Sequence, residues 1–197
     1  MADEAAVADI ALMARVRLGD ERAFEELHRR YQRRVLAFFY GMAGDGHAAN
    51  DLCQETFLRV WKVRRRYRAT GSFPGYLFGI ARLIWLERCR EWRKALRLGQ
   101  ATSFDDAWAT LSDPGAHPDD RAARSETATE IRRALESLPE EQRIVFVMRT
   151  IRGLSLEDIA AALDCPINTV RSRKILAVKK LRHALAHLVP GPVGARY

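Results

Sequence analysis

Cysteine is scarce in this chain of 197 residues, which holds only Cys53, Cys89 and Cys165. The three are far apart and odd in number, and no two of them form a Cys-x-x-Cys motif. This pattern excludes a disulfide framework and fits a reducing compartment with idle thiols. We therefore expect the protein to be cytoplasmic.

Long apolar runs are also missing. No segment approaches the ~20 apolar residues that a membrane-spanning helix needs. The first nine residues contain Asp3, Glu4 and Asp9 but no basic residue, whereas a secretory signal starts with positive charge. We expect neither membrane insertion nor secretion.

Signatures of catalysis and of cofactor binding are lacking as well. Gly41, Gly44 and Gly46 have neither the spacing nor the preceding strand of a nucleotide site. His183 and His187 are four residues apart, a spacing that can hold a metal ion, but no Glu follows the first His and no third ligand is near. The expectation is a protein that is not an enzyme, with no cofactor and no metal.

Charge is plentiful, with a net value of +8, and it is distributed in blocks. Residues 1–100 carry +7, residues 101–130 carry −5 and residues 131–197 carry +6. Basic blocks attract polyphosphates such as nucleic acid. Two solvated helical surfaces would give the same pattern, so charge alone does not decide between these interpretations.

Apolar residues recur three and four positions apart through most of the chain, which predicts helices. We expect them at about 6–18, 21–42, 48–66, 74–98, 126–137, 139–152, 155–163 and 166–188. Gly41, Gly44 and Gly46 are expected to form a turn. From Gly99 to Ser125 the periodicity fails, and prolines and five aspartates predict a linker.

The predicted fold is therefore all-α, with two small helical domains joined by a flexible linker. The expected domains are residues 1–98 and 126–189, with an acidic linker over 99–125 and a tail over 190–197. The linker does not determine how the two domains sit relative to each other.

The segment from Ser155 to Leu181 predicts a helix-turn-helix. Ser155 and Asp158 are spaced as a capping box for a short helix, and a tight turn at Asp164 and Cys165 precedes a basic second helix. The N-terminus of that helix offers free amides and a positive dipole to phosphate, and its side chains could enter a major groove. A plain helical hairpin is the alternative.

Several motifs together resemble the ECF (extracytoplasmic-function) sigma factors of bacterial RNA polymerase. In the second half these are Leu-Pro-Glu-Glu-Gln-Arg from Leu138, Gly-Leu-Ser-Leu-Glu-Asp-Ile-Ala from Gly153, and Thr-Val-Arg-Ser-Arg from Thr169. In the first half, Asp-Leu-Cys-Gln-Glu-Thr-Phe from Asp51 is similar to the family's polymerase-binding helix. Phe-Pro-Gly-Tyr-Leu-Phe-Gly-Ile-Ala-Arg from Phe73 is similar to its promoter-opening helix.

The resemblance implies that the protein binds core RNA polymerase and directs promoter-specific initiation. Its partners would be the clamp coiled coil of the largest subunit, the flap, promoter DNA and an anti-sigma factor. Asp51, Gln54 and Glu55 would face the coiled coil. Asp51 and Glu55 are four apart on one helical face, although an ordinary solvated face has the same pattern.

The resemblance also divides DNA contacts between two promoter elements. Residues implied at the minus-ten element are Arg65, Arg66, Tyr67, Arg68, Phe73, Tyr76, Arg82 and Trp85. Cations along the backbone and aromatic rings for unstacked bases suit melted DNA. Residues implied at the minus-thirty-five element are Ser155, Asn168, Thr169, Arg171, Ser172, Arg173 and Lys174.

Two departures from the family pattern stand out. Leu83 occupies a position where many relatives carry Asn. Ile175, Leu176 and Val178 cannot all face the core if Val170, Ala177 and Leu181 do, and exposed apolar residues often mark interfaces. Two other functions stay open: a helix-turn-helix regulator that binds DNA unaided, and an adaptor that binds polymerase or an anti-sigma factor without opening promoters.

Overall fold

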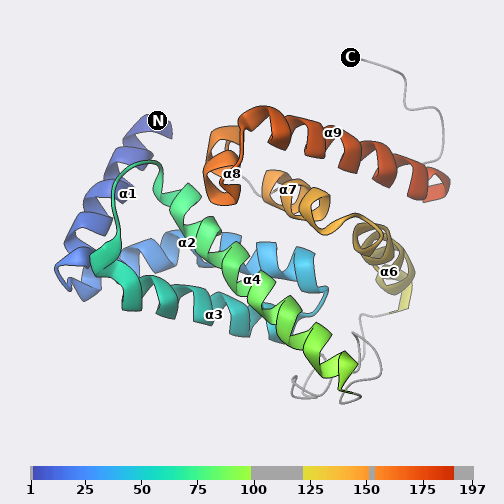
Figure 1. Cartoon of the computed structure of the whole chain (residues 1–197), viewed down its shortest axis with the longest axis horizontal. Coiled ribbons are helices and arrows are strands. Elements are labelled where there is room, and N and C mark those ends of the chain that lie inside the picture. The colour runs from blue at the N-terminus through green and yellow to red at the C-terminus, as the bar shows by residue number, and fades with distance from the viewer. Residues whose placement is uncertain (1, 99–121, 151–153, 189–197) are drawn as a thin grey trace.

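The computed structural model describes residues 2–98, 122–150 and 154–188, and every regular element in those ranges is helical. The first half contains α1 (Ala2–Arg17), α2 (Glu21–Ala43), α3 (Gly46–Val63), the 3-10 turn η1 (Arg64–Arg66) and α4 (Phe73–Arg97). The second half contains α6 (Ala122–Glu136), α7 (Glu140–Thr150), α8 (Leu156–Leu163), α9 (Ile167–Ala184) and the 3-10 turn η2 (Ala186–Leu188) (Figure 1). The predicted all-α class is confirmed.

Local capping explains where four of these helices begin, namely α2, α3, α4 and α8. The side chains of Asp20, Asp45 and Ser72 each accept the amide three residues further on, at 2.9 to 3.1 Å. Ser155 and Asp158 form the expected reciprocal capping box. A side chain that satisfies an otherwise unpaired N-terminal amide stabilises a helix by about 1 kcal/mol, so these starts are encoded locally.

The structure corrects some of the expected boundaries. α2 ends at Ala43, one residue beyond the expected range of 21–42, and Gly44 caps it in the left-handed conformation (φ 71°), so Gly41 lies in the helix and not in the turn. The third helix stops at Val63 and continues as η1, and α6 begins at Ala122, inside the expected linker. The rest of the linker, residues 99–121, and the whole tail, residues 190–197, lie outside the described residues.

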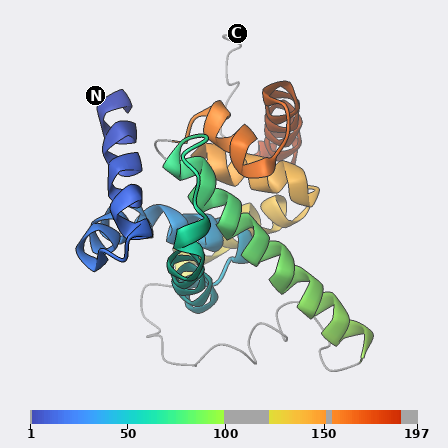
Figure 2. The same ribbon diagram turned by 60° about the vertical axis from the view of Figure 1, so that its left-hand side comes forward.

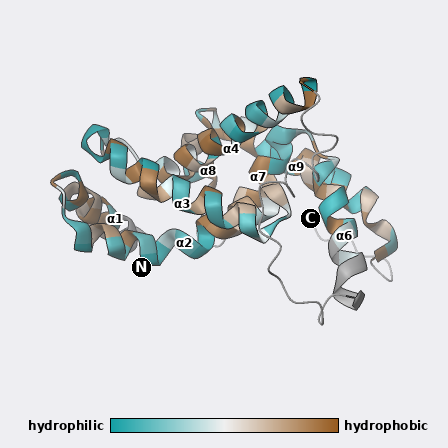
Figure 3. Ribbon diagram, turned by 90° about the horizontal axis from the view of Figure 1, so that it is seen from below, coloured by the Kyte–Doolittle hydropathy of each residue, from teal (hydrophilic) through white to brown (hydrophobic). Residues whose placement is uncertain are grey.

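The core runs through both halves of the chain. Phe38 and Phe78 pack edge to face between α2 and α4, and the same buried cluster includes Val145 of α7 and Ile159 of α8. The hydropathy colouring of Figure 3 shows the apolar sides of these helices turned inward. A second, smaller cluster around Ala134, Leu138, Ala177 and Leu181 joins α6 to α9.

The two halves are therefore packed against each other. α8 lies along α4, and α7 touches α2 (Figure 1, Figure 2). α9 crosses over α7 on the side away from α2 and α3. The linker composition leaves this arrangement undetermined, so it is information that only the structure supplies.

A buried polar cluster attaches α1 to the bundle. The Asp9 carboxylate is 3% exposed and accepts hydrogen bonds from the Tyr31 hydroxyl and from Nη1 of Arg30, the latter at 2.9 Å. Burial and the neighbouring carboxylate raise the pKa of the Tyr31 phenol. No helix among the described residues combines the length and the apolar character needed to cross a bilayer.

Candidate polymerase and promoter interfaces

The face of α3 expected to meet polymerase is on the surface. Asp51 and Gln54 are exposed, and Glu55 is half-buried. Glu55 accepts from Nη2 of Arg59 at 2.9 Å, and Nη1 of the same arginine reaches Glu87 of α4 at 2.6 Å. The acidic patch is thus part of an ion-pair chain, in which Asp51 is the carboxylate most open to a basic partner.

The basic run after α3 also faces solvent. Arg65, Arg66 and Arg68 are exposed, as expected for cations that track a nucleic-acid backbone. Arg64 differs from them: its guanidinium lies 4.1 Å from the Trp61 ring centroid and donates to the Trp61 carbonyl at 2.7 Å. Arg64 therefore packs against the C-terminal end of α3, while Arg65, Arg66 and Arg68 remain exposed to solvent.

Two aromatic residues expected at the minus-ten element, Phe73 and Trp85, lie in the core instead, and a third, Tyr67, is buried in the wall of a cavity. Tyr67, Phe73 and Trp85 are 3%, 1% and 0% exposed. The Phe73 ring packs against Tyr31 with centroids 5.2 Å apart, and Arg143 of α7 lies over Trp85 at 5.8 Å. In this arrangement the rings of Phe73 and Trp85 cannot stack on a base, which corrects the expectation for these two, because the apolar pattern of α4 does not reveal which faces other helices cover.

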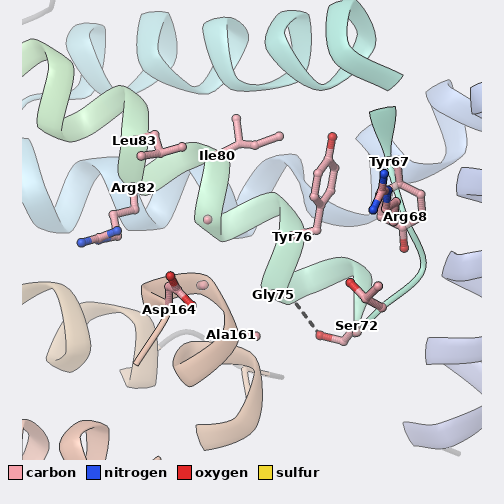
Figure 4. A pocket seen from close by; sticks show the side chains of 14 residues that line it. Tyr67, Arg68, Ser72, Gly75, Tyr76, Ile80, Arg82, Leu83, Ala161 and Asp164 are labelled. Atoms are coloured by element: carbon pink, nitrogen blue, oxygen red, sulfur yellow. Dashed lines mark hydrogen bonds between the residues drawn. The ribbon is translucent and has the colours of Figure 1, made fainter. Parts of the chain in front are cut away.

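A cavity of about 530 Å³ is lined by four of the expected minus-ten residues, Tyr67, Arg68, Tyr76 and Arg82. Tyr76, Arg82 and Leu83 line it from α4, Arg68 lines it from the loop before α4, and Ala161 lines it from α8 (Figure 4). The cavity combines apolar walls with nearby cations, so it suits a flat, partly apolar ligand beside a phosphate.

Two phenols beside this cavity have no hydrogen-bond partner among the described residues. They are the hydroxyls of Tyr67 and Tyr76, whose rings pack at 4.8 Å. Burial raises the pKa of both phenols, so they remain protonated donors. A buried donor without a partner costs free energy, and a polar group entering the cavity could satisfy it.

The helix-turn-helix is formed as expected. Asp164, in the left-handed conformation (φ 50°), ends α8, and α9 starts two residues after Cys165. Ser155, Asn168, Arg171 and Ser172 are exposed. The start of α9 therefore presents an open polar face.

Not every basic residue of α9 is equally available. Nη1 of Arg171 donates to Asn168 at 3.2 Å, so these two act as a pair. Arg173 is ion-paired with Glu141 of α7 and also donates to the Cys165 sulfur at 3.8 Å. Thr169 and Lys174 are half-buried. Asn168, Arg171 and Ser172 are thus the most open to solvent of the expected residues of α9.

The expected apolar surface on α9 is present. Ile175 is 66% exposed and Leu176 is 46% exposed, whereas Ala177 is buried.

Further along the chain His187 lies 3.0 Å from Glu130 of α6. Within the described ranges no group of three or more His, Cys, Asp or Glu side chains is arranged to hold a metal ion.

Each half of the chain matches a known protein family model. Residues 27–95 match the family model for sigma-70 region 2, and residues 128–181 match the model for sigma-70 region 4. The ECF RNA polymerase sigma-E factor of Escherichia coli is 30% identical over 188 residues, covering 92% of this chain and 96% of its own length. The chain belongs to the ECF sigma factors.

Other relatives of this sigma factor agree. The RNA polymerase sigma-H factor of Pseudomonas aeruginosa is 30% identical over 92% of this chain and 95% of its own length. The ECF RNA polymerase sigma factor SigE of Mycolicibacterium smegmatis is 36% identical over 85% of this chain and 65% of its own length. The chain therefore directs promoter-specific transcription initiation with RNA polymerase, as its family does.

Two solved structures share the fold. CnrH, solved in complex with the cytosolic domain of CnrY, aligns with a TM-score of 0.67 at 22% identity, covering 91% of this chain and 98% of CnrH. RpoE of Bartonella quintana, solved with the anti-sigma factor NepR, aligns with a TM-score of 0.64 at 22% identity, covering 83% of this chain and 96% of RpoE. At this identity they support the fold of this sigma factor.

The contact between region 2 and region 4 is the feature that sequence reasoning missed. Ser72, at the start of α4, donates a hydrogen bond to the Asp158 carboxylate of α8. Gly75 and Gly79 of α4 face Ala161 and Ala162 of α8. Two glycines four residues apart on a helix were a signal for close packing of another backbone.

Proposed function

We propose that this sigma factor binds core polymerase through the exposed face of α3 and reads promoters at two separate places. Region 2 would read the minus-ten element with Arg65, Arg66, Arg68 and the cavity beside Arg82. Region 4 would read the minus-thirty-five element with the N-terminal turns of α9. It would act by binding alone, in the cytoplasm, without a cofactor.

One observation carries this proposal: both sigma regions match in the family order, and each carries its own exposed polar face. Asp51 and Gln54 offer an acidic and an amide contact to a basic coiled coil. Asn168 and Arg171 stand at a helix N-terminus, where free amides and the helix dipole favour phosphate. A regulator that binds DNA unaided would have no use for the α3 face.

We also propose an anti-sigma partner for the apolar surface of α9. Ile175 and Leu176 are too exposed for a core role, and a protein partner that buries them would remove apolar area from water. RpoE of Bartonella quintana was solved with such a partner. Co-purification with a cognate inhibitor, lost in Ile175→Lys, would support this assignment.

Run-off transcription with core polymerase, with and without the protein, tests the central proposal. We expect promoter-dependent transcripts that Asp51→Ala and Arg171→Ala each reduce about tenfold, since each removes a contact worth roughly 1.4 kcal/mol. Glu25→Ala on α2 and Lys180→Ala on α9 are matched controls, because both residues are exposed and lie outside the proposed faces.

The outcomes separate the competing functions. Tight, sequence-specific binding to duplex DNA without polymerase would indicate a stand-alone regulator. Binding to polymerase without any transcript would indicate an adaptor. Either result would contradict the proposed function.

A further inference from the structure

The buried carboxylate of Asp9 lies on α1, outside the residues that match either family model. We propose that Asp9 is a positioning residue for promoter reading. Through Tyr31 it holds the reading loop, defined here as residues 67–72, in the position from which Arg68 meets the melted minus-ten strand. The inference rests on the proposed function, and it gives α1 a part in DNA recognition.

The reading loop has an exposed middle and buried ends. Residues 68–71 are exposed and belong to no helix or strand. Tyr67 at the start of the loop is 3% exposed, and Phe73, the first residue of α4 directly after the loop, is 1% exposed. The position of Arg68 therefore depends on the two buried rings that flank the exposed part.

Both of these rings belong to one chain of aromatic contacts that leads to α2. The Phe73 ring packs against Tyr31 with centroids 5.2 Å apart, and it lies 6.4 Å from the Tyr76 ring. Tyr76 in turn packs against Tyr67 at 4.8 Å. Figure 4 shows Tyr67 and Tyr76 near Arg68 and the start of α4. A shift of Tyr31 would therefore reach both ends of the reading loop.

Asp9 fixes the other side of Tyr31. Its carboxylate accepts the Tyr31 hydroxyl, and it also accepts Nη1 of Arg30 at 2.9 Å. The guanidinium of Arg34 lies over the Tyr31 ring, 4.8 Å from its centroid. With its hydroxyl bonded, one ring face covered and its edge packed on Phe73, Tyr31 has little freedom to change rotamer.

α1 also contacts both elements that flank the reading loop. It touches η1, which precedes the loop, and α4, which follows it. Met13 and Val16 of α1 are fully buried in the same core. Burial and, next, the charge of Asp9 raise the pKa of Tyr67, so the carboxylate also acts on the first residue of the loop.

Recognition needs this kind of support, because a binding group must be held within about 0.5 Å by packed and hydrogen-bonded neighbours. Loss of the bond between Asp9 and Tyr31 would loosen the ring chain and widen the range of positions open to Arg68. Asp51 and Gln54 lie in the N-terminal half of α3, away from η1. Binding to core polymerase should therefore not respond.

Strand preference of the protein assembled with core polymerase tests the inference. The probe is a non-template minus-ten strand that the wild-type assembly selects from a random pool of single strands. Preference is the affinity for this strand divided by the affinity for a scrambled strand. Partial unfolding lowers both affinities equally and leaves the preference unchanged, so a merely structural role of Asp9 would not alter it.

We expect Asp9→Ala and Tyr31→Phe each to lower the preference at least about fivefold, with affinity for core polymerase within about twofold of wild type. The double variant should lose no more than Asp9→Ala alone, because both changes break the same bond. Asp9→Asn keeps one acceptor and should retain part of the preference. Thermal melts choose an assay temperature at which every variant is folded.

Met42→Ala is the matched control for lost stability. Met42 is 2% exposed and lies on α2 about 16 Å along the helix from Tyr31. This variant should melt at a lower temperature and keep the strand preference of wild type. An unchanged preference in both Asp9→Ala and Tyr31→Phe, or a loss that Met42→Ala shares, would overturn the inference.

Hydrogen exchange in the free protein gives a second readout that does not depend on DNA. The amide of Tyr67 donates to the Arg64 carbonyl at 3.2 Å, and the amide of Gly75 donates to Ser72 at 3.1 Å. In Asp9→Ala both amides should exchange faster, relative to the amides of α3 in the same variant. Equal relative exchange in the variant and in wild type would overturn the inference. A wild-type assembly without strand preference would contradict the proposed function instead, and exchange would then decide whether Asp9 holds the loop.

Discussion

The free energy of the hydrogen bond between Ser72 and Asp158 can be measured separately from the other roles of these two residues. Each residue also has a role within its own half, since Ser72 caps α4 and Asp158 completes the capping box of α8. A single substitution removes both the local role and the link between halves. In a double-mutant cycle on Ser72→Ala and Asp158→Ala, the free energies of the two caps cancel. The remaining coupling free energy is that of the hydrogen bond between the two residues.

The structure sets the expected size of each effect. Loss of a cap costs about 1 kcal/mol, and loss of a half-buried hydrogen bond to a carboxylate costs about 1 kcal/mol more. Each single variant should therefore lose about 2 kcal/mol. The double variant should lose about 3 rather than about 4 kcal/mol, which gives a coupling free energy of about 1 kcal/mol.

Urea denaturation of the full chain, followed by circular dichroism at 222 nm, provides the four free energies of unfolding. Ser155→Ala combined with Ser72→Ala is the matched control, because Ser155 belongs to the same capping box but has no hydrogen bond to Ser72. That pair should be additive. Coupling below about 0.3 kcal/mol for Ser72 and Asp158 would refute the polar link between α4 and α8.

Two further predictions concern stability. Asp9→Ala should lower the free energy of unfolding by about 3 kcal/mol, because the buried Tyr31 hydroxyl and Arg30 both lose their acceptor. Asp9→Asn keeps one acceptor and should lose less, and equal losses in thermal melts would argue against this. Burial raises the pKa of Cys89 from 9.0 to about 12. The neutral buried thiol therefore contributes its full stabilisation of the folded state below about pH 9, and this stabilisation is lost as the pH rises toward 12. Cys89→Ala should flatten the fall in urea midpoint between about pH 8 and about pH 10, and an unchanged slope would contradict the assignment.

The sequence by itself determined the helices and the family. The caps at Asp20, Ser72 and Ser155 act within three residues, so their outcome depends on local chemistry. The turn at Asp164 was equally predictable. The paired motifs of the two regions also determined the family, because two motif sets in the right order are far more specific than one.

The sequence also suggested where the polar contact residues lie. Asp51, Gln54, Arg65, Arg66 and Arg171 were all expected at functional faces. The structure places each of them in solvent, because charged side chains remain hydrated unless a partner compensates them. Whether they contact polymerase or DNA stays a prediction for the experiments above.

Only the tertiary structure decided which apolar and small residues pack against which. Gly41 falls within the expected helix 21–42, but only the structure shows that its missing side chain leaves room for the methyl groups of Val147. Trp85 was expected at DNA, yet α7 covers it with Arg143. Contacts between residues far apart in sequence depend on how whole helices meet, and the periodicity of one helix does not reveal its partner. The packing of region 4 on region 2 is therefore a property of the folded chain.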